Sequence, residues 1–158
     1  MSANTKPPLN EAETHHATCV DFNGKGVLLI GKSGAGKSDL ALRLIKNNQH
    51  SSNLVTLVSD DRVCLTALNN ILIASPPKPL EGLLEVRGVG LCHFDFLAST
   101  SIYLLVKLDR NKAVERLPDF SQQQDTIVGI TIPYIVLNPF ESSAPLKISA
   151  ALEHLQAH

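Results

Sequence analysis

The sequence contains no tryptophan, and aromatic residues make up only 4% of it. Proteins that bind single-stranded nucleic acid stack the bases on aromatic side chains, so this scarcity argues against such a platform. The 14 lysines and arginines nearly balance the 15 aspartates and glutamates, which leaves a net charge of −1 without a long run of either sign. The charge pattern therefore predicts no nucleic-acid-binding surface and no membrane-binding surface.

The three cysteines, Cys19, Cys64 and Cys92, are odd in number and widely spaced, and they form no C-x-x-C pair. This pattern favours neither a disulfide framework nor a zinc site. No apolar run approaches the roughly 18 residues of a membrane-spanning helix, and residues 1–12 lack the apolar core of a signal peptide. We therefore expect a cytoplasmic protein whose cysteines are small buried side chains.

The chain of 158 residues is long enough for one domain, which would bury about 70% of its unfolded surface. Residues 1–13 are polar and include Pro7 and Pro8, so we expect a flexible N-terminal tail there. The ordered domain is expected over residues 14–158.

The most informative stretch is a strand-like apolar run over residues 27–30, followed by GKSGAGKS and then by a segment with helical periodicity. The pattern G-x-x-x-x-G-K-[ST] in this setting predicts a phosphate-binding loop, whose backbone N–H groups and helix N-terminus attract a triphosphate. The loop consists of Gly31, Lys32, Ser33, Gly34, Ala35, Gly36, Lys37 and Ser38. Lys37 would reach the β- and γ-phosphates and Ser38 would bind Mg²⁺. The alternative is a glycine-rich turn without a ligand.

A second candidate is the pair Asp60 and Asp61, which follows a short apolar strand over residues 54–58. In P-loop folds such carboxylates hold Mg²⁺ or orient the nucleophile, because ligands lie beyond the carboxyl ends of the strands. Adjacent residues of an extended chain point in different directions, so the two aspartates need not share one role. Without the glycine loop, the pair would equally fit a solvated turn.

Arginine and glutamate candidates lie further along the chain. In the stretch LLEVRGVGL over residues 83–91, an extended backbone would place Glu85 and Arg87 on one side, beside two glycines that permit close approach of a ligand. The pair could serve a metal and a phosphoryl group, or it could form an ordinary surface ion pair. Arg116 lies in a polar segment and on its own fits a solvated residue.

Hydrophobic periodicity and turn residues predict the other elements. We expect one hairpin across Asn23 and Gly24, and a second across residues 68–70. Further expected elements are strands over residues 101–108, 127–132 and 134–137, an extended loop over 75–79 and a helix over 146–155.

Four sequence features occur in the order typical of one enzyme family. They are a histidine, His16, that lies 21 residues before Lys37, the loop GKSGAGKSD, the stretch LVSDDRV and the stretch LLEVRGVGL. Together they resemble the catalytic domain of HPr kinase/phosphorylase, the bacterial enzyme that phosphorylates a serine of the phosphocarrier protein HPr. The last stretch is similar to the LLEIRGLGI signature of that family. The resemblance implies that residues 14–158 form a P-loop kinase catalytic domain, with the α/β fold and mixed central sheet shared by HPr kinase and phosphoenolpyruvate carboxykinases.

The resemblance also implies cofactors and their ligands. ATP would lie on the glycine loop with its β- and γ-phosphates on Lys37. Ser38 and Glu85 would hold Mg²⁺. Implied partners are an HPr-type phosphocarrier as substrate and inorganic phosphate in a reverse, dephosphorylating reaction.

Roles in the chemical step follow from the same resemblance. The pair Asp60 and Asp61 would contain the base that takes the serine proton, and the same group would act as the acid in reverse. His16 would lie beside that aspartate, while Arg87 and Arg116 would stabilise charge on the transferring phosphoryl group. Phosphoryl transfer requires mainly positioning and charge neutralisation, and histidine titrates near neutral pH, so a pH-dependent balance of the two directions is expected.

The sequence also departs from long family members. Fourteen residues precede His15, which fits a short form with the catalytic domain only. After Pro133 the chain lacks the basic, glycine-containing loop that is associated with dephosphorylation in long members. A homo-oligomer is expected of this chain only because the long members form one. Two alternatives remain: a P-loop kinase that acts on a small metabolite, and a nucleotide-binding regulatory module without transfer activity.

Overall fold

A computed structural model describes residues 12–111 and 114–156. Most of the tail expected over residues 1–13 lies outside the described residues, but Glu13 already belongs to a strand. The strands are β1 (Glu13–His15), β2 (Thr18–Phe22), β3 (Lys25–Ile30), β4 (Val55–Ser59), β5 (Val63–Leu68), β6 (Ile71–Ser75), β7 (Leu83–Val86), β8 (Gly90–His93), β9 (Thr100–Leu108), β10 (Gln124–Ile127) and β11 (Ile130–Leu137). The helices are α1 (Lys37–Asn47), the short 3₁₀ helix η1 (Lys78–Leu80) and α2 (Ala144–Gln156).

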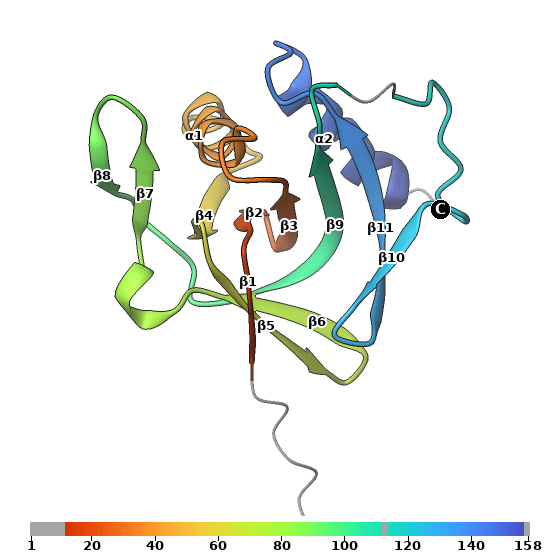
Figure 1. The fold of residues 1–158 in the computed structure, drawn as a ribbon, viewed down its shortest axis with the longest axis horizontal. Helices are drawn as coiled ribbons and strands as arrows, with labels where there is room; N and C mark the ends of the chain where they lie inside the picture. The colour runs from red at the N-terminus through yellow and green to blue at the C-terminus, as the bar shows by residue number, and fades with distance from the viewer. Residues whose placement is uncertain (1–11, 112–113, 157–158) are drawn as a thin grey trace, which may run out of the picture.

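The long strand β9 lies at the centre of a mixed sheet (Figure 1). It pairs in parallel with β3 on one side, and on the other its first residues pair with β6 and its last four with β11. The sheet continues antiparallel from β3 through β2 to β4, while β5 and β1 follow β6 at the opposite end. β7 and β8 form a separate two-stranded hairpin that stands apart at the side of the molecule in Figure 1.

Each face of the central strands is covered by a different layer. Successive side chains of a strand point to opposite faces. Val27 and Leu29 of β3 accordingly pack into a cluster with residues of α1 and α2, whereas Leu28 packs into a second cluster with residues of β5 and β6. Because the central strands are covered on both faces, residues 27–29 form a continuous apolar run instead of alternating with polar residues.

Both predicted turns are present and have the conformation that their residues favour. Asn23 and Gly24 have φ values of 49° and 94°, and Asn69 and Asn70 have φ values of 50° and 62°. Positive φ at both central residues matches the right-handed twist of a hairpin, and asparagine and glycine tolerate it best. The two turns confirm the predicted hairpins β2–β3 and β5–β6.

Three local expectations were wrong. Residues 83–91 are not one extended segment, because Gly88, with a φ of 85°, reverses the chain between β7 and β8. Pro133 does not divide two strands: it lies within β11, before the segment that pairs with β9, where its missing N–H costs no bond to that strand. The proline-rich loop contains η1, since Pro79 fits the first turn of a helix.

None of the helices in the described residues is long and apolar enough to cross a membrane. The α/β architecture with a mixed central sheet confirms the fold class expected from the sequence.

Candidate active site

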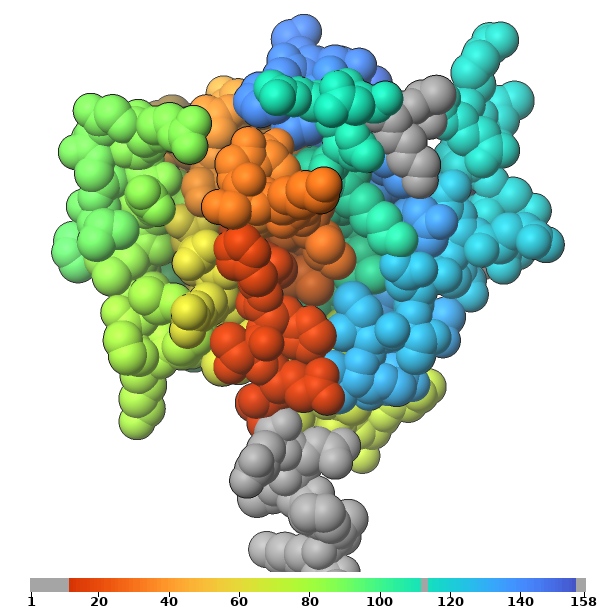
Figure 2. Space-filling model, viewed as in Figure 1, coloured from red at the N-terminus to blue at the C-terminus, as the bar shows by residue number. Residues whose placement is uncertain are grey.

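The glycine loop connects β3 to α1, as the strand–loop–helix pattern predicts. Gly34 and Gly36 have φ values of 81° and 98°, a region that residues with a Cβ rarely adopt. Gly36 is the N-cap of α1, so this conformation turns the chain directly into the helix. In Figure 2 the orange loop reaches the surface between the green β7–β8 hairpin and the teal end of β9. The start of α1 therefore lies at the surface, and the unpaired N–H groups in the first turn of a helix attract an anion.

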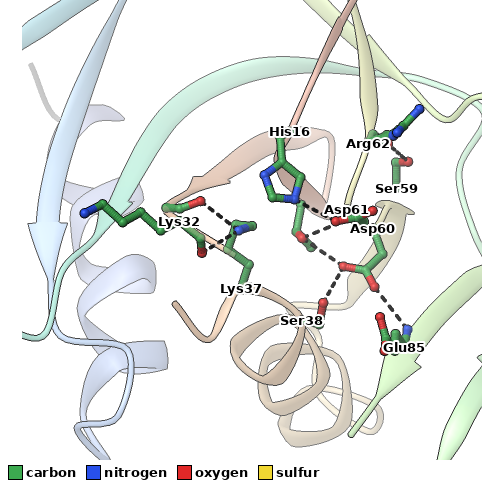
Figure 3. A network of polar contacts seen from close by, with 11 residues as sticks. His16, Lys32, Lys37, Ser38, Ser59, Asp60, Asp61, Arg62 and Glu85 are labelled. Carbon is green, nitrogen blue, oxygen red and sulfur yellow. Dashed lines mark hydrogen bonds and ion pairs between the residues drawn. The ribbon is translucent and has the colours of Figure 1, made fainter. Parts of the chain in front are cut away.

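Lys37 begins α1 and folds back over its own loop. Its Nζ donates to the carbonyls of Gly31, at 2.8 Å, and Lys32, at 3.0 Å (Figure 3). The residue as a whole is only 6% exposed. Burial lowers the pKa of Lys37, while the negative charges of Asp61 and Asp60 oppose that shift. The side chain of Lys32 extends away from Lys37 in Figure 3, so Lys37 is the lysine oriented into the loop.

Asp60 is buried, with 5% of its surface exposed, and accepts three hydrogen bonds. Its Oδ1 accepts from the hydroxyls of Ser38, at 2.6 Å, and Thr18, at 2.9 Å, and its Oδ2 accepts from the backbone N–H of Glu85 at 3.0 Å. A hydrogen bond to a charged group contributes about 1.5–3 kcal/mol. Asp60 thus ties the end of β4 to β2, α1 and β7. Figure 3 shows its bonds to Ser38 and Glu85.

Asp61 has a different environment from its neighbour. Its φ of 66° turns the side chain out of the strand direction, a conformation that aspartate tolerates better than most residues. Its carboxylate is 63% exposed and lies 2.7 Å from Nε2 of His16, which is 50% exposed (Figure 3). The N–H of Ala17 donates to the carbonyl of Asp61 at 3.1 Å, which holds the two segments together. Asp60 is therefore a buried anchor and Asp61 an exposed carboxylate with a histidine partner.

An open cavity of about 410 Å³ unites most of the predicted site residues. Its lining consists of His16, Ser33, Gly34, Gly36, Lys37, Ser38, Asp39, Leu42, Asp61, Glu85, Val86, Arg87 and Phe140. Lys37, Ser38, Asp61, His16, Glu85 of β7 and Arg87, which directly follows β7, thus meet around one space, although they come from four segments of the chain.

Five predicted residues lie outside this lining: Gly31, Lys32 and Ala35 of the phosphate loop, together with Asp60 and Arg116. Asp60 lies buried behind Ser38 and contributes through it. Arg116 lies on the exposed connection between β9 and β10 and does not line the cavity. Its role in stabilising the phosphoryl group therefore stays a prediction without support from the geometry of this chain.

The residues present fit a magnesium ion bound together with a triphosphate. The described residues contain no group of three or more His, Cys, Asp or Glu that could form a metal site of protein ligands alone. Mg²⁺ typically uses one or two protein oxygens together with substrate phosphates and water. Ser38 and Glu85 both line the cavity and supply such oxygens, and Asp60 orients the Ser38 hydroxyl.

The sequence analysis missed several contributors. Thr18 fits an ordinary strand residue, and only the structure shows that its hydroxyl contacts Asp60. Phe140 lines the cavity from a loop after β11, a segment to which the sequence analysis assigned no role. Asp39 directly follows the phosphate-loop motif, and its position at the start of the helix was a usable signal.

The fold and the site define an α/β protein with a glycine loop of P-loop pattern at the start of a helix and a histidine–aspartate pair beside it. The family model described as HPr Serine kinase C-terminal domain matches residues 8–151. The chain belongs to this family, which confirms the resemblance drawn from the sequence.

Known relatives agree with this assignment. HPr kinase/phosphorylase of Caldicellulosiruptor bescii is 33% identical over 156 residues, covering 90% of this chain and 48% of that protein. HPr kinase/phosphorylase of Clostridium botulinum (strain Eklund 17B / Type B) is 36% identical over 110 residues, covering 70% of this chain and 33% of that protein. The chain thus spans between a third and a half of the length of these two curated relatives.

A solved structure, that of the Hpr(Ser) kinase/phosphatase from Coxiella burnetii, superposes with a TM-score of 0.74 at 26% sequence identity. The match covers 92% of this chain and 97% of that chain. It confirms the HPr kinase-like fold over nearly the whole described chain.

Proposed function

We propose that this chain is a kinase that uses ATP and Mg²⁺ to phosphorylate a serine of an HPr-type phosphocarrier protein. The observation that carries the proposal is the hydrogen-bonded pair of His16 and Asp61, which opens into the same cavity as the phosphate loop and Lys37. A kinase needs a triphosphate site and a carboxylate that accepts the hydroxyl proton within one space. The names of the relatives, HPr kinase/phosphorylase, support the choice of substrate.

Asp61 is the better candidate for the base. The carboxylate of Asp60 is buried and already accepts three hydrogen bonds, so a substrate hydroxyl has no access to it. The carboxylate of Asp61 is mostly exposed and lines the cavity. We propose that Asp61 accepts the serine proton as the serine oxygen bonds to the γ-phosphorus and the bond from that phosphorus to the bridging oxygen of ADP breaks.

The other cavity residues would bind and neutralise the phosphates. Lys37 would exchange one of its carbonyl contacts for the β- and γ-phosphate oxygens, and Arg87 would stabilise the charge on the transferring group. Ser38 and Glu85 would hold Mg²⁺, which supplies further positive charge at the phosphates when bound. In the reverse direction, inorganic phosphate would take the phosphoryl group from phosphoserine and leave as pyrophosphate, while protonated Asp61 returns its proton to the serine oxygen.

The test is incubation of the purified chain with ATP labelled on its γ-phosphate, Mg²⁺, a purified HPr-type carrier and, separately, a protein-free extract of small metabolites. We expect label on a serine of the carrier and none on a carrier whose serine is replaced by alanine. Lys37→Ala is the negative control and is expected to lose both transfer and most of the ATP affinity. Label on a small molecule alone would indicate a metabolite kinase. ATP binding without any transfer would indicate a regulatory module.

A further inference from the structure

One wall of the cavity has no role in phosphate chemistry. Phe140 lines the cavity together with Gly34, Gly36 and Lys37 of the phosphate loop, and 54% of its surface is exposed. An exposed phenylalanine costs free energy in water, because removing apolar surface from water is favourable. Phosphate oxygens gain nothing from an aromatic wall. Phe140 is therefore suited to a flat apolar part of a ligand whose anionic part occupies the loop.

The loop that carries Phe140 is fixed to the helix that begins at the phosphate loop. Arg43 of α1 donates one hydrogen bond to the carbonyl of Pro139 and another, at 3.4 Å, to the carbonyl of Glu141. Asp39 in turn lies 3.1 Å from Nε of Arg43 and orients it. The N–H of Phe140 donates to the side chain of Asn138 at 3.0 Å. The backbone that carries the ring is thus held in place before any ligand binds, which lowers the entropy cost of binding.

The ring lies directly against the phosphate loop. A Cβ placed on Gly36 would meet the ring of Phe140 and the ring of Pro139 at 3.3 Å each. The guanidinium carbon of Arg110, two residues after the end of β9, lies 6.0 Å from the Phe140 ring centre, a distance at which cation–π attraction acts. In Figure 2 the blue segment after β11 lies beside the teal end of β9, above the orange phosphate loop. An aromatic face and an additional positive charge therefore border the triphosphate site.

The cavity continues from the loop along one side of α1. Ser38 and Leu42, four residues apart, lie on the same side of that helix and both line the cavity, as does Val86 of β7. Ligand sites typically combine such apolar walls with a few fixed polar groups. The polar groups here are those of the phosphate loop, and the apolar wall includes the Phe140 ring.

We propose that Phe140 is the stacking platform for the nucleobase of the bound triphosphate, a specificity role that rests on the proposed binding of a nucleotide. Every base has an aromatic face, so stacking alone does not distinguish adenine from guanine. The platform therefore contributes to affinity for nucleoside triphosphates as a class. It contributes nothing to inorganic polyphosphates, which lack a base.

The experiment measures dissociation constants by titration calorimetry in the presence of Mg²⁺, with ATP, GTP and inorganic tripolyphosphate as ligands. Variants are Phe140→Ala, Phe140→Tyr, which keeps the ring, and Tyr103→Ala, which removes an equally exposed aromatic side chain outside the cavity lining. We expect Phe140→Ala to weaken the binding of ATP and of GTP by the same factor, about 5- to 150-fold, because stacking on one base contributes about 1–3 kcal/mol. The affinity of Phe140→Ala for tripolyphosphate is expected to stay within about twofold of the wild-type value. Phe140→Tyr and Tyr103→Ala are expected to bind all three ligands with wild-type affinity.

Two results would overturn the platform alone. In the first, Phe140→Ala weakens the binding of tripolyphosphate as much as the binding of ATP, which would mean that the ring supports only the shape of the phosphate loop. In the second, Phe140→Ala leaves ATP affinity unchanged. A wild-type chain that binds none of the three ligands would overturn the proposed function and the platform together. Failure of the platform is thus distinguishable from failure of nucleotide binding.

Discussion

Nε2 of His16 lies 2.7 Å from Oδ1 of Asp61, although 45 residues separate them in the sequence. The register of two strands produces this contact. β2 and β4 pair antiparallel with Cys19 opposite Ser59, so the residues just before β2 meet the residues just after β4. The pairing of β2 and β4 therefore delivers a histidine to one aspartate of the pair, beside the phosphate loop.

The first prediction concerns that aspartate. Asp61→Asn is expected to slow phosphoryl transfer to the carrier by about 10²- to 10⁴-fold, the usual contribution of a general base, because an amide cannot accept the serine proton. ATP affinity should remain close to that of the wild type, since the side chain acts in the chemical step. Labelled-phosphate transfer and titration calorimetry measure the two effects. The matched control is Asp95→Asn, which changes an exposed carboxylate outside the cavity lining. A normal transfer rate in Asp61→Asn would show that Asp61 is not the base.

Asp60→Asn should behave differently, because Asp60 is an anchor for three donors. Loss of its charge weakens these bonds, and we expect the free energy of unfolding to fall by about 1–3 kcal/mol. The Mg²⁺ concentration needed for nucleotide binding should rise, because the Ser38 hydroxyl loses its charged partner and is oriented less firmly. Urea denaturation and calorimetry at several Mg²⁺ concentrations test both effects. A variant with wild-type stability and the same transfer loss as Asp61→Asn would show that the roles of the two aspartates are reversed.

The sequence analysis could locate this pair but could not separate its members. Both residues follow the same strand, and no local pattern shows that Asp61 adopts a left-handed backbone while Asp60 stays buried. That difference comes from long-range contacts with Thr18 and His16, which only the assembled sheet provides. The strand–loop–helix arrangement around the glycine loop, in contrast, was predictable because it depends on consecutive residues, while phosphate binding at the loop stays a prediction.

The other differences have similar causes. Residues 83–91 fit one extended strand by composition, but the φ of Gly88 depends on the pairing of β7 with β8, which is a tertiary contact. Arg116 gained its predicted role from the family resemblance alone, and the structure leaves it outside the cavity lining. Phe140 lay beyond the recognised motifs, and the contact with Arg43 that anchors its loop spans 96 residues or more.

His16 is expected to control the pH dependence of the reaction. Its Nε2 lies 2.7 Å from the carboxylate of the proposed base, so its removal is expected to change how readily that carboxylate accepts and returns a proton. We expect His16→Ala to lower forward transfer by about tenfold, less than the loss of the base itself, and to flatten the change in the ratio of forward to reverse rates between about pH 6 and 8. Both rates are measured with labelled ATP and with the phosphorylated carrier plus inorganic phosphate.

The adjacent histidine provides a matched control for this prediction. Nε2 of His15 lies 3.1 Å from Glu13, and His15 does not line the cavity, so His15→Ala should keep the wild-type pH profile. An unchanged balance of rates in His16→Ala would exclude His16 from the mechanism.

Thr18 is expected to support the site through stability. Its buried hydroxyl donates to Asp60 at 2.9 Å, and valine has nearly the same shape without the donor. Thr18→Val would leave a buried carboxylate with one donor fewer, which should lower the free energy of unfolding by about 1.5–3 kcal/mol. Urea denaturation measures the change. Thr126→Val, which removes an exposed hydroxyl bonded to Thr131, should cost less than about 0.5 kcal/mol, and equal costs at both positions would contradict this account.

Cys19 should make the fold sensitive to alkaline pH. It lies fully buried in β2, and burial, with a smaller contribution from the negative charge of Asp21, raises the pKa of its thiol. Above about pH 8.5 an unfolded thiol loses its proton while the folded one keeps it. The unfolded state then binds fewer protons, so the free energy of unfolding falls as pH rises, by up to about 1.4 kcal/mol per pH unit.

Comparison with Cys19→Ala isolates this effect, because the variant lacks the thiol but keeps every other group that titrates. Near pH 7 the wild type should be the more stable protein, since alanine leaves a small cavity in the core. We expect its advantage to shrink by about 2 kcal/mol between pH 8.5 and 10, measured by urea denaturation. Cys92→Ala, at a partly exposed position, is the control, because it shows whether removal of any cysteine produces the same pH-dependent change in stability. A difference between wild type and Cys19→Ala that stays constant over this range would show that the buried thiol does not resist ionisation.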